Sequence, residues 1–243
     1  MHHWIYLLDL AGVVVFALSG IALACRVRMD PIGMLVLAAV TGIGGGTLRD
    51  LLLGVRPVFW VTDPTYLWVI LATVIVSMAG LHFVHHLPKR LLSVLDAFGL
   101  ALFTVLGANK AMMLDYTGIV AVLMGLLTGV AGGACRDVLA GRIPMVLRQE
   151  IYATASILGA AAYVALVEVG AFEGLALALG LGVTLMLRLS AIYWHLALPT
   201  FVWLPRPEEE RYDPERDPLP PGDQRRHKRV QVVASRPRRR RRQ

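Results

Sequence analysis

The stretch TGIGGGTLRDLLLGVRP, at residues 41–57, recurs as TGVAGGACRDVLAGRIP at residues 128–144, an offset of 87 positions. The same offset pairs Asp9 with Asp96, Gly12 with Gly99, Phe16 with Phe103 and Gly20 with Gly107. Shared apolar composition does not explain glycines and charges that match at one register. The sequence therefore contains an internal repeat, and a repeat of this length sets the architecture.

The composition is that of a membrane protein. Hydrophobic residues make up 56% of the 243 positions, and the mean hydropathy is +0.62. A bilayer-spanning helix needs about 20 consecutive apolar residues. Seven such spans are expected, at 4–24, 31–55, 65–86, 91–112, 117–141, 151–170 and 172–195.

Each copy of the repeat holds three of these spans. Because three is odd, the second copy enters the membrane from the opposite side, an inverted arrangement that recurs among transporters. We therefore predict an all-α integral membrane protein with seven transmembrane helices, built from two inverted three-helix repeats plus a seventh helix. The expected divisions are 1–88, 89–171, 172–204 for the seventh helix, and a tail at 205–243.

The glycine runs predict a helix break in the second and fifth spans. Glycine in a helix interior costs about 1 kcal/mol relative to alanine, and irregular backbone inside a bilayer survives only when it is buried or lines a wet cavity. We expect breaks at Gly44, Gly45 and Gly46 and at Gly132 and Gly133, lining a pore, with Thr47 capping the second half of its helix. The alternative is that these glycines allow close helix packing.

Charged residues follow both glycine runs. Arg49 and Asp50 point about 100° apart on a helix, so they are not expected to pair with each other. An unpaired arginine deep in the bilayer is costly. We therefore expect Arg49 to pair with Asp137 of the second copy, and Arg136 to pair with Asp50. Such pairs would line the pore or simply hold the two halves together.

Four further charges are weaker signals. Lys110, near the end of the fourth span, extends to the membrane surface or gates the pore. Asp9 and Asp96 begin their spans and are interpreted as stabilising helix N-termini. Arg188, in the last span, faces the membrane interface or another charge.

The tail carries most of the net charge. Residues 205–243 hold 13 Lys or Arg and 7 Asp or Glu and are rich in proline, which predicts disorder. Basic residues after odd-numbered spans put the N-terminus outside and the C-terminus in the cytoplasm. The tail is interpreted as a solvated segment that marks the cytoplasmic side and touches anionic membrane lipids, in preference to a dedicated binding site, and no nucleic-acid partner is expected. The sequence offers no metal-ligand cluster or nucleophile arrangement, so neither a cofactor nor an enzymatic activity is expected.

The two motifs also identify a family resemblance. GIGGGTLRDLLLG and GVAGGACRDVLAG, each followed three residues later by proline in two three-span copies with a seventh span after them, resemble the prokaryotic trimeric intracellular cation (TRIC) channels. The resemblance covers roughly residues 4–200. It implies a homotrimer in which each subunit has its own pore, lined chiefly by the second and fifth spans, for monovalent cations and potassium foremost.

The expected function is a potassium channel in the inner membrane of a bacterium. The alternative is a secondary transporter for a small neutral amino acid such as glycine, since some bacterial relatives resemble glycine transporters. Inverted repeats suit both activities, and the sequence alone does not separate them.

Overall fold

The computed structural model describes residues 3–81, 88, 90–148, 151–194, 200–202 and 231–233. The chain divides into two units, Met1–Leu196 and Ala197–Gln243. In the second unit, β1 (Thr200–Val202) and β2 (Gln231–Val233) pair in antiparallel register, with Thr200 opposite Val233. The predicted disordered tail at 205–243 lies outside the described residues, apart from β2.

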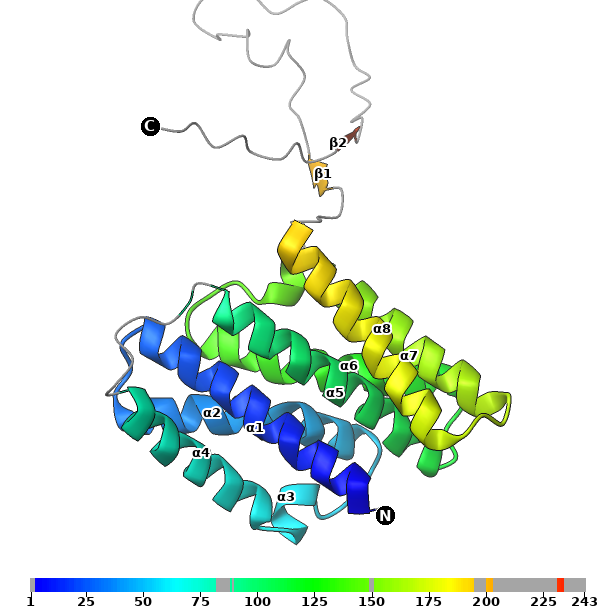
Figure 1. Ribbon diagram of the computed structural model, residues 1–243, viewed down its shortest axis with the longest axis horizontal. Coiled ribbons are helices and arrows are strands. Elements are labelled where there is room, and N and C mark those ends of the chain that lie inside the picture. Colours follow the sequence, from blue (N-terminus) through cyan, green and yellow to red (C-terminus); the bar gives the residue numbers. More distant parts are fainter. Residues whose placement is uncertain are drawn as a thin grey trace, which may run out of the picture. The chain divides into compact units, whose positions relative to one another are not determined.

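In its described part, the first unit consists of helices joined by turns and short connections (Figure 1). Its helices are α1 (His3–Arg26), α2 (Pro31–Leu52), α3 (Phe59–Thr62), α4 (Thr65–Leu81), α5 (Leu91–Met113), α6 (Gly118–Leu139), α7 (Ala153–Glu168) and α8 (Glu173–Trp194), with a 3₁₀ turn, η1 (Met145–Leu147), after α6. The seven expected spans correspond to every α-helix except the short α3. Five are long and apolar enough to cross a bilayer, and α4 and α7 are shorter apolar helices.

The predicted helix breaks are wrong. Helix α2 runs without interruption through Gly44, Gly45 and Gly46, and α6 runs through Gly132 and Gly133. A continuous helix keeps its backbone hydrogen bonds inside the bilayer, which removes the cost that a break would impose. Thr47 therefore caps nothing: it lies inside α2, where its hydroxyl donates to the carbonyl oxygen of Ile43 at 2.7 Å.

The glycines instead let α2 and α6 touch. A Cβ added at Gly45 would collide with the carbonyl oxygen of Thr128, and one added at Gly132 would collide with that of Thr41. Thr41 and Thr128 are themselves matched by the offset of 87, as are Gly45 and Gly132. The contact is thus reciprocal, and it is the close packing that the alternative interpretation of the glycines describes.

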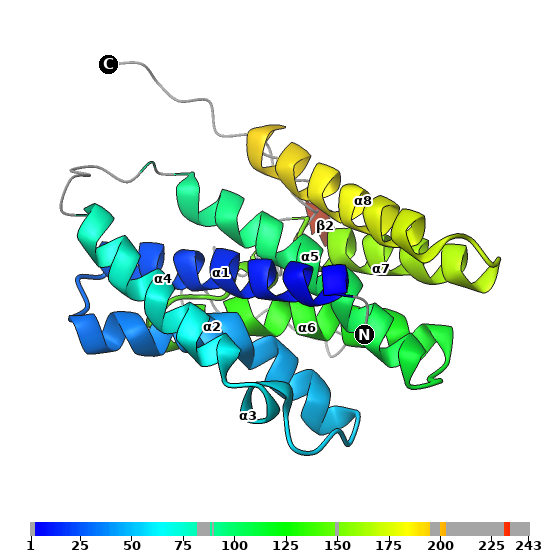
Figure 2. The ribbon, with the colours of Figure 1, turned by 60° about the horizontal axis from the view of Figure 1, so that its bottom comes forward.

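The two repeats meet in the same reciprocal way elsewhere. Phe16 of α1 lies against Gly99 of α5, and Phe103 of α5 lies against Gly12 of α1. Helices α2 and α6 run in opposite directions in both views (Figures 1 and 2). Helices α1, α2, α5 and α6 form the centre, with α4 against α1 and α2, and with α7 and α8 against α5.

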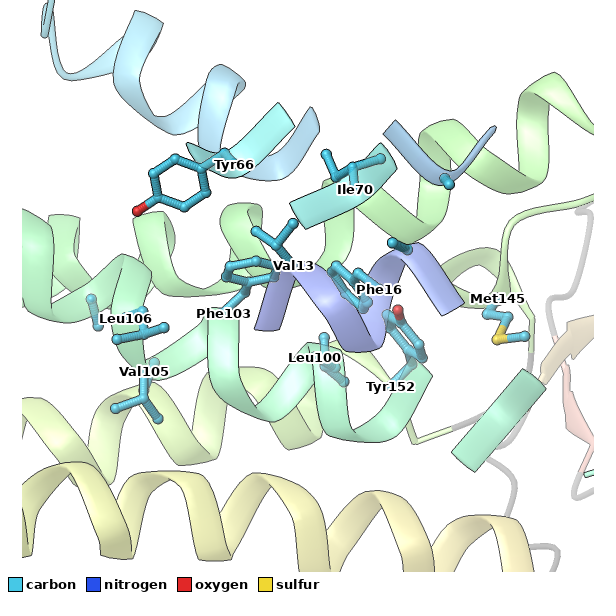
Figure 3. Close-up of a cluster of buried hydrophobic side chains, with 14 of the residues drawn as sticks. Val13, Phe16, Tyr66, Ile70, Leu100, Phe103, Val105, Leu106, Met145 and Tyr152 are labelled. Carbon is cyan, nitrogen blue, oxygen red and sulfur yellow. The ribbon is translucent and has the colours of Figure 1, made fainter. Parts of the chain in front are cut away.

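Aromatic residues fill the middle of this centre. The rings of Phe16 and Phe103 lie with centroids 5.2 Å apart and tilted by 52°, and both side chains are buried. Figure 3 shows the pair between Tyr66 on one side and Tyr152 and Met145 on the other. The buried aromatic part of the core therefore lies in the middle of the bundle, between its two ends.

Both motifs end their helices in the same way. Gly54 and Gly141 adopt positive φ angles of 70° and 65°, which favour glycine. The N–H group of the next residue then bonds back to the carbonyl oxygen of Asp50 or Asp137, at 2.9 and 2.8 Å. The chain continues into the short helix α3 after the first motif and into η1 after the second.

Candidate functional site: two buried charge clusters

The first cluster lies in the last turn of α2. Arg49 folds back on its neighbour, donating from Nε to Asp50 Oδ1 at 2.9 Å and placing Nη2 at 2.8 Å from the same oxygen. Lys110 of α5 reaches that oxygen as well, with Nζ at 2.9 Å. The Asp50 carboxylate is fully buried and Arg49 is nearly so, so two cations share one buried anion.

The second oxygen of Asp50 organises the following turn. Asp50 Oδ2 accepts the backbone N–H of Phe59, the first residue of α3, at 3.0 Å. The Arg49 guanidinium lies 5.7 Å from the centre of the Phe59 ring, within cation–π range. The carboxylate therefore holds its own helix end, α3 and α5 together.

A small cavity with a mainly apolar lining and a few polar groups opens beside this cluster. Its volume is about 60 Å³, and its polar lining comes from Asp9, Arg49, Tyr66, Asn109 and Lys110. The Tyr66 hydroxyl donates to Asp9 Oδ2 at 2.6 Å, so the second carboxylate of this region also has a partner. The cavity has room for water, and its lining offers both charged and dipolar groups.

A second tyrosine–aspartate pair joins α1 to the connection before α4. The Tyr6 hydroxyl donates to Asp63 Oδ2 at 2.6 Å, and the backbone N–H of Thr65 donates to Asp63 Oδ1 at 3.0 Å. Hydrogen bonding by Thr65 and then by Tyr6 holds the pKa of the Asp63 carboxyl below its ordinary value. Asp63 thus keeps its negative charge at this end of the bundle through the physiological range.

The second cluster repeats the first in the last turn of α6. Arg136 Nε donates to Asp137 Oδ1 at 2.9 Å, with Nη2 at 2.8 Å from the same oxygen. Asp137 Oδ2 accepts the backbone N–H of Met145, which begins η1, at 3.0 Å. Arg136 Nη1 adds a salt bridge to Asp96 Oδ1 at 3.0 Å and a hydrogen bond to the Ser19 hydroxyl.

This second cluster is more enclosed than the first. Arg136 and Asp96 are fully buried, and Asp137 nearly so, whereas the Lys110 side chain of the first cluster is 22% exposed. Tyr152 and Arg188 are buried beside it, with the Arg188 guanidinium 4.7 Å from the centre of the Tyr152 ring. The two ends of the bundle therefore differ in access although their motifs match.

The predicted cross-repeat pairs are wrong. Arg49 pairs with Asp50, and Arg136 pairs with Asp137. Because α2 and α6 are antiparallel, the last turns that carry these residues lie at opposite ends of the bundle. The arginine side chain is long enough to curl back on its neighbour despite the angle between them. Lys110 does not extend to the membrane surface, since it turns inward to Asp50.

Sequence reasoning missed several members of the clusters. Asp9 and Asp96 lie inside α1 and α5 and serve as hydrogen-bond and ion-pair partners, not as helix-start residues. The offset of 87 that matches them was the available signal. Tyr66, Tyr152 and Ser19 carry no such signal, because nothing in the local sequence distinguishes them from other core positions.

Within the described residues, no group of three or more His, Cys, Asp or Glu side chains is placed to hold a metal ion. What the clusters offer instead is neutralised charge at both ends of a helical bundle.

The model of the family described as Glycine transporter matches residues 6–82 and then 93–168. The chain belongs to this family. The two matches begin 87 residues apart, as the repeat does, so the family model matches each copy of the repeat in this chain.

Two bacterial membrane proteins are similar to this chain over most of its length. The UPF0126 inner membrane protein YadS of Escherichia coli strain K12 is 50% identical over 203 residues, covering 81% of this chain and 96% of the relative. A UPF0126 membrane protein of Vibrio cholerae is 49% identical over 197 residues, covering 81% and 82%. With five helices long and apolar enough to cross a bilayer, this chain is, like these relatives, a membrane protein, and it crosses the bilayer several times.

Solved structures connect the glycine-transporter family to channels. The TRIC trimeric intracellular cation channel orthologue from Rhodobacter sphaeroides is 42% identical, with a TM-score of 0.75 over 79% of this chain and 98% of that one. A prokaryotic TRIC channel crystallised in 0.5 M KCl is 29% identical, with a TM-score of 0.74 over 82% and 100%. The resemblance to prokaryotic TRIC channels is thereby confirmed, and the chain has the TRIC fold.

Proposed function

We propose that this protein is a passive channel for monovalent cations, potassium foremost, that assembles as a homotrimer with a pore in each subunit. The observation that carries the proposal is the match to a TRIC cation channel orthologue over nearly the whole of that protein. We place it in the bacterial inner membrane, as the name of the Escherichia coli relative indicates for that protein. All seven apolar helices then span the bilayer, with the N-terminus outside and the C-terminus in the cytoplasm.

The pore would run along the centre of the bundle, from the cavity beside Asp50 to the cluster around Asp137. This keeps the expected location near the second and fifth spans, α2 and α6, but replaces broken helices with two polar clusters, one beside a cavity and one enclosed. Arg136 shares its charge with Asp137 at 2.8 Å. Arg49 and Lys110 share Asp50, and Asp9, which lines the same cavity, supplies the second negative charge there. The oxygens of Asp9 and the Asn109 side chain beside the cavity can replace part of a cation's water shell.

A barrier separates the two ends. Phe16 and Phe103 occupy the middle of the path with centroids 5.2 Å apart, and α2 touches α6 at Gly45 and Gly132. Hydrophobic constrictions close channels by excluding water. Opening therefore requires this aromatic pair to move, with Lys110 as a gating residue at the more accessible end.

A glycine transporter remains the second candidate. It is favoured by the description of the family model and by the unequal access of the two clusters, one beside a cavity and the other fully buried. Alternating access needs such a difference between two inverted halves. In a carrier, the charged groups of the cavity would bind the carboxylate and ammonium groups of the amino acid.

Flux through proteoliposomes separates the two candidates. For a channel, a potassium gradient sets the membrane potential, flux does not saturate at millimolar potassium, and added glycine changes neither. Asp50→Asn is expected to lower the flux, while Asp115→Asn, the same exchange at an exposed loop position, leaves it unchanged. Saturable glycine uptake driven by an ion gradient, without potassium current, would replace the channel with the carrier.

A further inference from the structure

The first cluster contains balanced charges. Asp9 and Asp50 supply two negative charges, while Arg49 and Lys110 supply two positive ones. Asp9, Arg49 and Lys110 line one cavity, and Asp50 forms ion pairs with both cations. Three of these four groups belong to the first repeat, and the fourth, Lys110, comes from α5 of the second. The first repeat thus depends on the other repeat for its second cation.

The same rule leaves the second cluster one cation short. Asp96, Asp137 and Arg136 are the counterparts of Asp9, Asp50 and Arg49. The position that corresponds to Lys110 is 23, in α1, and it holds a fully buried leucine. From the repeated positions alone, the second cluster would carry a net charge of −1 inside the protein, where an unbalanced charge is expensive.

Helix α8 brings a cation to this place from outside the repeats. Arg188 is fully buried, and its guanidinium lies 4.7 Å from the centre of the Tyr152 ring. Its Nη1 is 3.4 Å from the carbonyl oxygen of Ile151, and its Nη2 is 4.0 Å from the sulfur of Met145.

Both of its side-chain neighbours also contact the cluster. The N–H of Met145 donates to Asp137 Oδ2 at 3.0 Å. The Tyr152 hydroxyl and Asp96 Oδ1 lie on the same small space at Gly133, at 3.2 and 3.0 Å from the position of an added Cβ. The other carboxylate oxygen of Asp96, Oδ2, is buried with no hydrogen-bond partner among the described residues.

We propose that Arg188 is the missing fourth charge of the second cluster, and that α8 completes that end of the path by supplying the cation which Lys110 supplies at the other end. This deepens the proposed function and rests on it for the transport arm only. Arg188 is a positioning residue: it contacts the cluster through Tyr152 and Met145, and its charge balances that of the two carboxylates. The helix outside the repeats is thereby part of the permeation machinery and not a peripheral addition.

A double-mutant cycle in the full-length protein tests the inference. Arg188→Met keeps most of the side-chain volume but removes the charge, and we expect the melting temperature to fall by about 10 °C. Adding Asp96→Asn removes one negative charge and is expected to restore most of that loss. The melting temperature of Arg188→Lys, which keeps the charge, should fall less than that of Arg188→Met. Leu177→Ala, a buried apolar position on α8, controls for packing and gains nothing from Asp96→Asn.

A relocation variant removes the remaining ambiguity. Leu23→Lys together with Arg188→Met moves the cation to the position that corresponds to Lys110, and we expect part of the lost melting temperature to return. In proteoliposomes, Arg188→Met leaves one unbalanced negative charge and raises potassium flux about threefold, and Asp96→Asn reverses the rise. A purely structural role would not produce this reversible change in flux.

The outcomes separate the two proposals. If Asp96→Asn adds its own loss to that of Arg188→Met, Arg188 is a packing residue and the inference is overturned. If the thermal rescue occurs but wild-type protein passes no potassium, the charge balance stands and the channel proposal fails. If wild-type protein conducts and Arg188→Met changes neither melting temperature nor flux, the inference alone fails.

Discussion

Neighbouring glycines in α2 offer a direct test of how this bundle is packed. Gly44 and Gly45 are adjacent in sequence, but they face different surroundings. A Cβ at Gly44 would meet only Val40 Cγ1, at 3.9 Å, whereas a Cβ at Gly45 would collide with the carbonyl oxygen of Thr128. Alanine at these two positions should therefore have opposite effects on stability.

The magnitudes come from the two environments. Gly44→Ala gains helix propensity, worth up to about 1 kcal/mol, at a site with ordinary van der Waals distances. Gly45→Ala gains the same propensity but forces α2 and α6 apart, and overpacking of this kind costs about 1–3 kcal/mol. Because the obstacle is backbone and not a flexible side chain, we expect the upper end and a net loss of about 2 kcal/mol.

Thermal unfolding of the purified protein in detergent measures both effects. For a unit of this size, 1 kcal/mol shifts the melting temperature by about 2–4 °C. The melting temperature should therefore rise by up to about 4 °C in Gly44→Ala and fall by about 4–8 °C in Gly45→Ala. Gly132→Ala, the counterpart of Gly45 in the second repeat, should behave like Gly45→Ala. A clear loss at Gly44 would refute the reasoning, since it would mean that the backbone there needs glycine and that α2 is broken after all.

Three further variants test other parts of the structure. Asp50→Asn leaves two cations without their shared anion, so the free energy of unfolding should fall by about 3–5 kcal/mol. The double variant with Lys110→Met should regain part of this loss, as thermal unfolding will measure. Phe103→Ala removes half of the aromatic barrier. The free energy of unfolding should fall by about 3–5 kcal/mol, and potassium flux into liposomes should rise. Phe103→Leu should change both quantities less. Trp60→Phe removes the indole donor to Thr47, and chemical denaturation should show a loss of about 1 kcal/mol in stability. Adding Thr47→Ala to this variant should not increase the loss.

Much of the fold could be predicted because its signals are local. Apolar runs of bilayer length mark the spans, and the offset of 87 marks the repeat without any knowledge of contacts. The role of the glycines could not be read in this way. Whether Gly45 breaks a helix or admits a neighbour depends on the backbone of Thr128, which lies on another helix and becomes visible only when the two are placed together.

The charge pairs show a second limit of sequence reasoning. The number of charges was right: two arginines and two aspartates in matched positions do form buried ion pairs. Their pairing was wrong because inversion of a repeat moves corresponding ends apart, so Arg49 and Asp137 pair within their own motifs instead. The cations that complete each cluster, Lys110 and Arg188, lie far away in sequence and do not match each other, and no periodicity identifies them.

The difference between the two ends of the bundle originates in the segments that come directly after each motif. After the first motif, Trp60 of α3 donates its indole N–H to the Thr47 hydroxyl at 3.0 Å, which ties α3 to α2 beside the cavity. At the corresponding places in the second repeat, the chain has Leu147 and Ala134. Leucine has no donor to satisfy and alanine has no acceptor to offer, so both halves of the hydrogen bond are absent together.

This joint exchange leaves the second turn to be held in another way. Met145 N–H still donates to Asp137, but the space beside it is filled by Tyr152 and Arg188 from later parts of the chain. The duplicated Arg-Asp motif thus occurs at two different ends of the bundle. At the accessible end a tryptophan hydrogen-bonds to the motif helix, and at the enclosed end a helix from outside the repeat completes the cluster. The asymmetry that gating or alternating access requires is therefore built from residues that the duplication did not copy.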